Sequence, residues 1–170
     1  MNYFKRFPKT FYSRDNYINN FEYVTNIMVR IRLFDSVLNS RTAFYSYTVG
    51  DGERPDTVAH KYYGDSKYAW VVLAANNYID PLFEWPLNAE ELDSYIISEY
   101  GSIESAKSNI KFYYKTINGR KYIVDGSSDF DSTQDSYQFE IELNESRRQI
   151  KILDRAYIPQ LEAELKDIFK

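Results

Sequence analysis

The sequence predicts an α+β fold, in which strands and helices follow each other along 170 residues. Three observations carry this prediction. A strand-like run at 43–49, AFYSYTV, is followed by a glycine-containing break and two helical runs. The dipeptide Asn118-Gly119 lies between two further strand-like runs and is a strong β-hairpin signal. A last strand-like run, at 149–153, precedes a helical run.

The composition excludes several kinds of site and function. The absence of cysteine excludes disulfides and thiolate zinc sites. The net charge of −4 argues against nucleic-acid binding, which needs a basic surface. Aromatic residues make up 18% of the chain, with 17 tyrosines, which fits either a protein interface or a tyrosine-rich core. The start of the chain lacks a signal-like apolar stretch, and the longest apolar run, at 68–75, is too short for a membrane span, so we expect a soluble protein made in the cytoplasm.

Two segments precede the strand at 43–49. Residues 1–22 form an aromatic arm without a sustained period, and we expect it to be extended and to dock onto a partner. In the segment 23–42, apolar residues from Tyr23 onwards fall at helical spacing, which predicts an amphipathic helix to about Asn39.

Residues 43–86 continue with two helices and a loop. Pro55 lies in the first turn of one helix, which Gly64 ends. The second helix, at 67–76, is apolar almost all round and should be buried. The run DPLFEWP, at 80–86, is predicted to be a loop between two prolines.

Residues 87–147 hold a further helix and the hairpin. Asn88 and Glu91 have the spacing of a capping box, and the helix they begin ends at Gly101. The two-residue turn predicts two cross-strand pairs: Tyr114 with Ile123, and Tyr113 with Val124. A polar loop follows at 126–136.

The last part of the chain closes the predicted fold. The segment 137–148 fits either a strand or a helix, and we favour the helix. Residues 148–170 supply a closing strand, QIKIL at 149–153, and a final helix that starts at Pro159, with one apolar face: Leu161, Leu165, Ile168 and Phe169.

The sequence offers little catalytic chemistry. His60 is the one histidine, and we expect it to face solvent. The acidic loop around Asp125, Asp129 and Asp131 lacks the glycine and glutamate spacing of an EF-hand, so a solvated loop is the better interpretation. There is no glycine-rich phosphate loop and no serine elbow. We therefore expect no enzyme, no cofactor and no bound metal.

The stretch YTVGDGERPDTVAHKYYGD, residues 47–65, resembles the LysM module. The matching positions are Tyr47, Val49, Gly52, Val58, Ala59, Tyr62 and Gly64, followed downstream by Trp70, Leu73 and the DPLFEWP loop. The resemblance implies a βααβ core. It also implies binding of N-acetylglucosamine polymers such as peptidoglycan or chitin, which is the usual function of such modules.

Two departures from this pattern make glycan binding doubtful. Glu53-Arg54-Pro55 replaces the family's Asp-Thr-Leu, and an acidic helix follows Pro86 where the closing strand belongs. A lone strand is not stable, so a second one must come from elsewhere in the chain. We therefore predict that residues 87–147 are an insertion and that Gln149–Leu153 pairs with Ala43–Val49.

Over residues 23–170 the chain also resembles a narrower family, the LysM-like baseplate wedge subunits of T-even-type contractile-tailed bacteriophages (the gene product fifty-three family). The matching motifs are VRIRLFDSVL, the Arg54-Pro55 pair, YYG, YAWVVLAANN, the DP-x-x-x-W loop and RRQIKIL. The resemblance implies a virion structural subunit of the tail baseplate, which binds other wedge subunits and helps join adjacent wedges around the hub during assembly.

We expect the candidate interface to use aromatic and charged side chains of the arm, the glycine loop and the helix ends: Phe4, Phe7, Phe11, Tyr12, Glu53, Arg54, Pro55, Tyr62, Tyr63, Trp85 and Arg148. Tyr62 and Trp70 fit an ordinary core role equally well. The alternative function is that of a LysM-type peptidoglycan- or chitin-binding protein.

Overall fold

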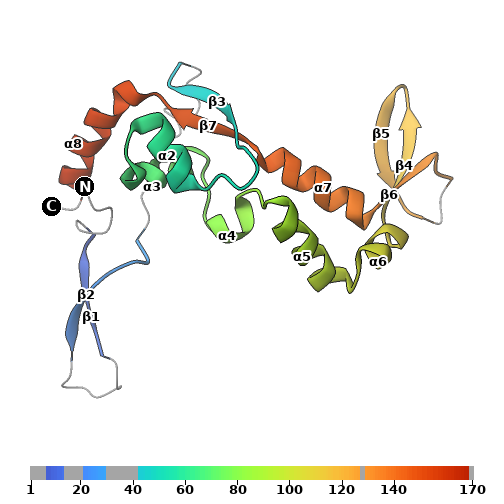
Figure 1. Cartoon of the computed structure of the whole chain (residues 1–170), viewed down its shortest axis with the longest axis horizontal. Helices are drawn as coiled ribbons and strands as arrows, with labels where there is room; N and C mark the ends of the chain where they lie inside the picture. The colour runs from blue at the N-terminus through green and yellow to red at the C-terminus, as the bar shows by residue number, and fades with distance from the viewer. Residues whose placement is uncertain (1–6, 14–20, 30–41, 127–128, 169–170) are drawn as a thin grey trace. The chain divides into compact units, whose positions relative to one another are not determined.

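The computed structural model describes residues 7–13, 21–29, 42–126 and 129–168, with side chains to residue 165. The fold is α+β, as predicted. The described α-helices and strands are labelled in Figure 1. The chain divides into two compact units: unit 1 comprises Met1–Tyr47, Glu53–Pro81 and Ile150–Lys170, and unit 2 comprises Thr48–Gly52 and Leu82–Gln149.

The described part of unit 1 begins with an antiparallel hairpin of β1 (Lys9–Tyr12) and β2 (Glu22–Thr25), drawn in blue in Figure 1. Phe11 lies opposite Tyr23, with ring centroids 4.1 Å apart. The predicted helix is therefore wrong over residues 23–29, where a strand and a turn replace it, because cross-strand aromatic pairing overrides the helical spacing. The rest of that prediction, residues 30–39, lies outside the described residues.

The rest of unit 1 is built around a two-stranded sheet. In it β3 (Phe44–Thr48) pairs with β7 (Gln149–Leu153), which confirms the predicted pairing of these distant segments. Between them in the sequence come the first three helices of the core: α2 (Pro55–Tyr63), the 3-10 helix η2 (Ser66–Tyr68) and α3 (Ala69–Ala75). This order agrees with a βααβ core, while the likeness to LysM modules remains a prediction.

Local signals set the limits of these helices, and burial anchors them. Pro55 occupies the first turn of α2, and Gly64 ends the helix at φ 84°, a conformation that favours glycine. The C-terminal elements are η3 (Arg155–Tyr157) and α8 (Ile158–Ile168). One buried cluster joins them to the sheet and to α3: Ala43, Val71, Leu153 and Ile158, with Trp70 and Leu161 packed against it. Trp70 is thus a core residue.

Unit 2 combines helices with a three-stranded sheet of order β5-β4-β6. Its elements are α4 (Pro81–Glu84), α5 (Ala89–Tyr100), α6 (Ile103–Ser108), β4 (Ile110–Ile117), β5 (Arg120–Val124), β6 (Ser132–Asp135) and α7 (Ser136–Arg147). Asn88 and Glu91 form the predicted capping box. The β4–β5 register contains both predicted pairs, Tyr114 with Ile123 and Tyr113 with Val124. The preference for a helix at 137–148 is also confirmed.

Three elements of this region differ from the prediction. The expected loop at 80–86 contains the single turn α4, and α6 follows α5 directly, with Ser102 as its N-cap. Part of the expected polar loop at 126–136 is the strand β6. Its sequence, STQD, has no apolar alternation, and it pairs with β4 through the backbone while Gln134 accepts a hydrogen bond from the Tyr114 hydroxyl at 2.7 Å. Backbone pairing of this kind leaves little trace in a sequence.

Candidate protein-interaction surface

The residues of the glycine loop are held by a small polar network in unit 1. The Tyr47 hydroxyl donates to Glu53 Oε2 at 2.8 Å, and Lys61 Nζ donates to Glu53 Oε1 and to the Tyr47 oxygen, both at 3.0 Å. The hydrogen bond with Tyr47, and then that with Glu53, raises the pKa of Lys61. Glu53 is thus engaged within the chain. Its carboxylate ties the glycine loop to Tyr47 of β3 and to Lys61 of α2.

Arg54 and Pro55 follow Glu53 and have different surroundings. The Arg54 side chain is exposed and lies 3.5 Å from the Asp56 carboxylate. An exposed pair of this kind contributes little to stability, so Arg54 remains available to a partner. Pro55 is half-buried at the first turn of α2, where its fixed φ favours the helix. Only Arg54 of the two has the exposure expected of a charged interface residue.

A row of tyrosine rings crosses unit 1 beside the sheet. Tyr62 lies between Tyr45, with centroids 6.3 Å apart, and Tyr63, at 5.0 Å edge-on. The Tyr63 hydroxyl donates to the Leu153 carbonyl at 2.9 Å, and burial raises the pKa of Tyr63. Tyr63 therefore supports β7, while Tyr62 is half-buried and Tyr45 is exposed. Sequence reasoning missed Tyr45, although its place in an alternating strand was visible.

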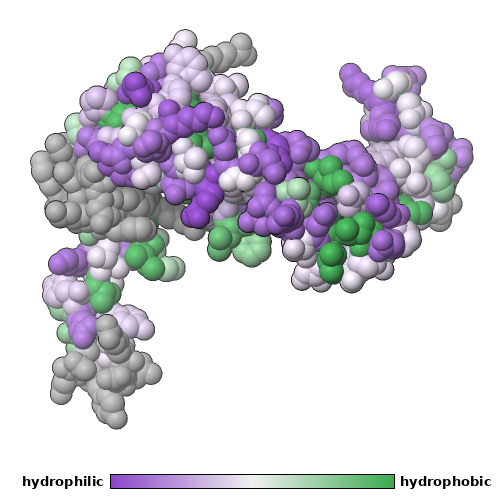
Figure 2. Space-filling view, viewed as in Figure 1, coloured by the Kyte–Doolittle hydropathy of each residue, from purple (hydrophilic) through white to green (hydrophobic). Residues whose placement is uncertain are grey.

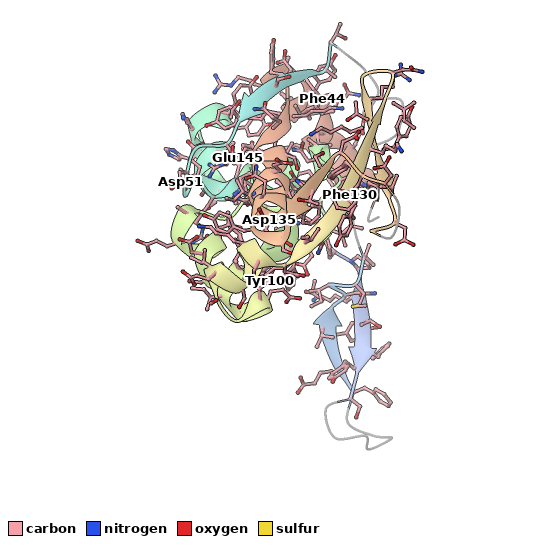
Figure 3. The ribbon with its side chains drawn as sticks, turned by 90° about the vertical axis from the view of Figure 1, so that its right-hand side faces the viewer. Phe44, Asp51, Tyr100, Phe130, Asp135 and Glu145 are labelled. Carbon is pink, nitrogen blue, oxygen red and sulfur yellow. The ribbon has the colours of Figure 1, made fainter. Side chains whose placement is uncertain are left out.

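Several other predicted interface residues are largely buried. Phe7 and Trp85 are buried, which gives both a packing role. In unit 2 the Arg148 side chain is only 15% exposed: it donates to Asp51 at 3.0 Å and to Glu145 at 2.9 Å. Figure 3 labels Asp51 and Glu145. Phe4 lies outside the described residues.

Among the described residues of unit 1, the N-terminal hairpin carries a cluster of exposed aromatic side chains. Phe11 and Tyr23 are each 61% exposed, and Tyr12 and Phe21 are exposed beside them. The rings of Phe11 and Phe21 meet edge-on with centroids 6.5 Å apart. The structure thus brings two predicted residues, Phe11 and Tyr12, together with Phe21 of the arm and with Tyr23, which the sequence analysis had placed in a helix. Alternation within 21–25 was the signal that could have found them.

A second apolar surface lies on α4 in unit 2. Leu82 and Phe83 are 80% and 70% exposed, and Figure 2 shows hydrophobic residues over this turn. Neither residue was predicted as a site residue. The sequence hint was two consecutive large apolar residues after a proline, a pattern that does not suit a fully solvated loop.

The described residues offer no obvious site for metal chemistry. Among them, no three His, Cys, Asp or Glu side chains gather closely enough to hold a metal ion. Of the helices in this part of the chain, none is both long and apolar enough to cross a membrane. His60 is exposed on α2. The described surface instead exposes aromatic and apolar side chains, which are typical of protein–protein interfaces.

Comparison with known families agrees with this surface. The model of the family described as base plate wedge protein 53 matches residues 3–131, which includes the hairpin, the β3–α3 segment and most of unit 2. No curated protein matches the chain. Because the match covers well over half of the 170 residues, the chain belongs to the base plate wedge protein 53 family, the structural proteins of the bacteriophage baseplate wedge.

Proposed function

We propose that this subunit binds other wedge proteins and helps join adjacent wedges around the hub during baseplate assembly. The observation that carries the proposal is the cluster of exposed aromatic side chains on the β1–β2 hairpin. A two-stranded hairpin is only marginally stable in water by itself. Covering its rings with a partner removes apolar surface from water and stabilises the hairpin at the same time.

The two ends of the proposed interface differ in chemistry. Phe11 and Tyr23 supply rigid aromatic area at the hairpin, and the exposed guanidinium of Arg54 supplies a charged contact on α2. Tyrosine and arginine are among the residues that dominate binding energy in protein interfaces. Membership of a wedge family and this surface together support a binding role. In this proposal the subunit is made in the host cytoplasm and becomes part of the virion tail.

The organisation of the chain supports a core with an inserted unit. β3 and β7 are neighbours in one sheet although about a hundred residues separate them. Leu82–Gln149 forms a second compact unit together with the short stretch Thr48–Gly52. We therefore retain the division into an arm (1–22), a segment 23–42, a core (43–86), an insertion (87–147) and a closing segment (148–170) as part of the proposal. In it, the scaffold of a glycan-binding module serves protein assembly.

The proposal is tested with the other wedge proteins of the same phage, purified one by one. Isothermal titration calorimetry compares the wild-type chain with Phe11→Ala and Tyr23→Ala. We expect each substitution to weaken binding by about 1–4 kcal/mol. Tyr122→Ala, an exposed aromatic on β5 of unit 2, is the matched control and should bind as the wild type does.

The alternative function makes the opposite prediction. A LysM-type glycan-binding protein is retained by insoluble peptidoglycan, and free oligosaccharide competes it off. We expect no such retention. Competable binding to peptidoglycan, together with no affinity for any wedge protein, would replace the proposed function by the alternative.

A further inference from the structure

The two strands of the β3–β7 sheet differ in whether the backbone groups on their outer edges are hydrogen-bonded. The Asp154 N–H donates to the Ala43 carbonyl, and the Val49 N–H donates to the Arg148 carbonyl, both at 2.8 Å. These bonds lie at opposite ends of the pair, so the strands are antiparallel, and the residues between them alternate in direction. Lys151 and Leu153 of β7, and Phe44 and Ser46 of β3, consequently direct their backbone groups away from the partner strand.

The outer edge of β7 is closed by side chains. Asn76 Oδ1 accepts from the Lys151 N–H, and Asn76 Nδ2 donates to the Lys151 carbonyl, both at 2.8 Å. The Tyr63 hydroxyl donates to the Leu153 carbonyl. Three outward backbone groups of β7 are thus satisfied within unit 1, and no further strand can pair there without displacing Asn76.

The outer edge of β3 is open in the described part of the chain. β3 has one neighbouring strand, and the side chains of Tyr45, Ser46 and Thr48 are exposed. Phe44, at the start of the strand, is labelled in Figure 3. The outer edge of β3 presents alternating N–H and C=O groups from Phe44, Ser46 and Thr48, and another strand can pair with this pattern.

β3 also lacks the usual protection of an exposed edge. Natural edge strands carry charged residues, proline or bulges that prevent pairing with other chains. Every other described strand contains a charged residue, such as Lys9 in β1, Glu22 in β2 and Arg120 in β5, whereas β3 is FYSYT. One edge of this sheet is closed and the other is left both open and uncharged, which is the arrangement of a strand-docking site.

We infer that the outer edge of β3 binds an extended segment of another wedge protein, which adds a third strand to the sheet. This inference rests on the proposed function. The incoming strand places alternate side chains beside Tyr45 and Tyr47, so β-branched or aromatic residues suit those positions. A second copy of this chain is the weaker occupant, because two copies carry the same net charge of −4 and repel each other.

Ser46→Pro tests the inference in the full-length chain. Proline removes the outward N–H of Ser46 and leaves the hydrogen bonds between β3 and β7 intact. A sheet tolerates proline at such an outward-facing position of an edge strand. Ser46→Ala keeps the N–H and is the control. With the purified wedge protein that the wild-type chain binds, we expect Ser46→Pro to weaken binding about tenfold or more and Ser46→Ala to leave it unchanged. Equal binding by wild type and Ser46→Pro overturns the inference while the proposed function stands.

Amide hydrogen exchange in the wild-type chain gives a readout that does not depend on a variant's folding. In the free chain the amides of Tyr45 and Tyr47, which face β7, should be protected, and those of Phe44, Ser46 and Thr48 should exchange fast. On binding the wedge protein the second set should become protected; unchanged exchange overturns the inference. If the wild-type chain alone forms dimers and Ser46→Pro is monomeric, the edge of β3 binds a second copy of the chain, which also overturns the inference. A wild-type chain that binds no wedge protein overturns the proposed function along with it.

Discussion

Asn76 holds both backbone groups of Lys151 with one side-chain amide, across 75 positions of the sequence. The same amide nitrogen also donates to the Val72 carbonyl at 2.8 Å, which ties the end of α3 to β7. A single side chain thus replaces a neighbouring strand on the outer edge of β7. The contact closes the β7 edge, so that the edge available to another strand in the described part of the chain is that of β3.

Asn76→Ala should destabilise unit 1. It leaves the Lys151 N–H and carbonyl without their protein partners, and a lost partner of this kind costs about 1–3 kcal/mol. Asn76→Asp keeps an acceptor for the N–H but loses the donor, so its loss should be intermediate. Urea denaturation followed by circular dichroism measures both. Equal stability of Asn76→Ala and the wild type would show that water replaces the amide fully.

Gly126→Ala should destabilise the sheet of unit 2. A Cβ at this position would lie 2.6 Å from the Tyr113 ring, which packs edge-on against Phe130 with centroids 4.9 Å apart. Displacing the ring should cost about 1 kcal/mol, at the lower end of what overpacking costs. In a Tyr113→Ala background the same substitution should be neutral or slightly stabilising. A cost that persists without the ring would mean that the backbone of Gly126, and not the clash, is responsible.

Asp65 should make part of the stability of unit 1 depend on pH. Its Oδ1 accepts from the Lys67 N–H at 2.9 Å, and its Oδ2 lies 3.0 Å from Lys67 Nζ. The backbone hydrogen bond, followed by the Lys67 ammonium, holds the pKa of Asp65 below its ordinary value of 3.8. Because the folded pKa is the lower one, the stabilisation is present above pH ~4 and is lost as the pH falls through the folded value.

Asp65→Asn is the variant that isolates this effect. It keeps an acceptor for the Lys67 N–H and removes the charge. The stability difference between wild type and variant should therefore shrink as the pH is lowered from about 5 to about 2. Thermal unfolding across that range measures the difference, and a constant difference would assign the role of Asp65 to geometry alone.

Phe83→Ser should separate folding from binding. The side chain is 70% exposed on α4, so its loss should change the free energy of unfolding by no more than about 0.5 kcal/mol. If the apolar surface of α4 is an interface, affinity for a wedge protein should fall by about 1 kcal/mol or more. Glu90→Ser, an exposed residue of α5, is the control. A large loss of stability in Phe83→Ser would mean that the ring supports unit 2 instead.

Predictions that depended on local geometry agree with the structure. Asn118 and Gly119 adopt positive φ values of 50° and 76°, as a two-residue hairpin turn requires, and the register of β4 and β5 follows from that turn. The prediction of an N-terminal helix was wrong because Tyr23 finds its partner in Phe11, twelve positions earlier, and not within the next turn of a helix. The same holds for the candidate interface residues. The exposure of Arg54 follows from its local position before a helix, whereas nothing in the local sequence around Trp85 indicates that it is buried.

The sequence by itself determined the α+β class, the ends of most helices, the central hairpin and the likeness to baseplate wedge proteins. Those features depend on interactions within a few residues or on the order of short motifs. Only the tertiary structure decided that Arg148 is held by Asp51 and Glu145 and that Phe21 and Tyr23 are exposed on a hairpin. It also decided that Asn76 closes one edge of a sheet, while the edge of β3 is open among the described residues. Apart from the pair of Arg148 with Glu145, three positions away, each of these depends on groups that are distant in the sequence, and the spacing of residues carries no record of which distant group a side chain meets.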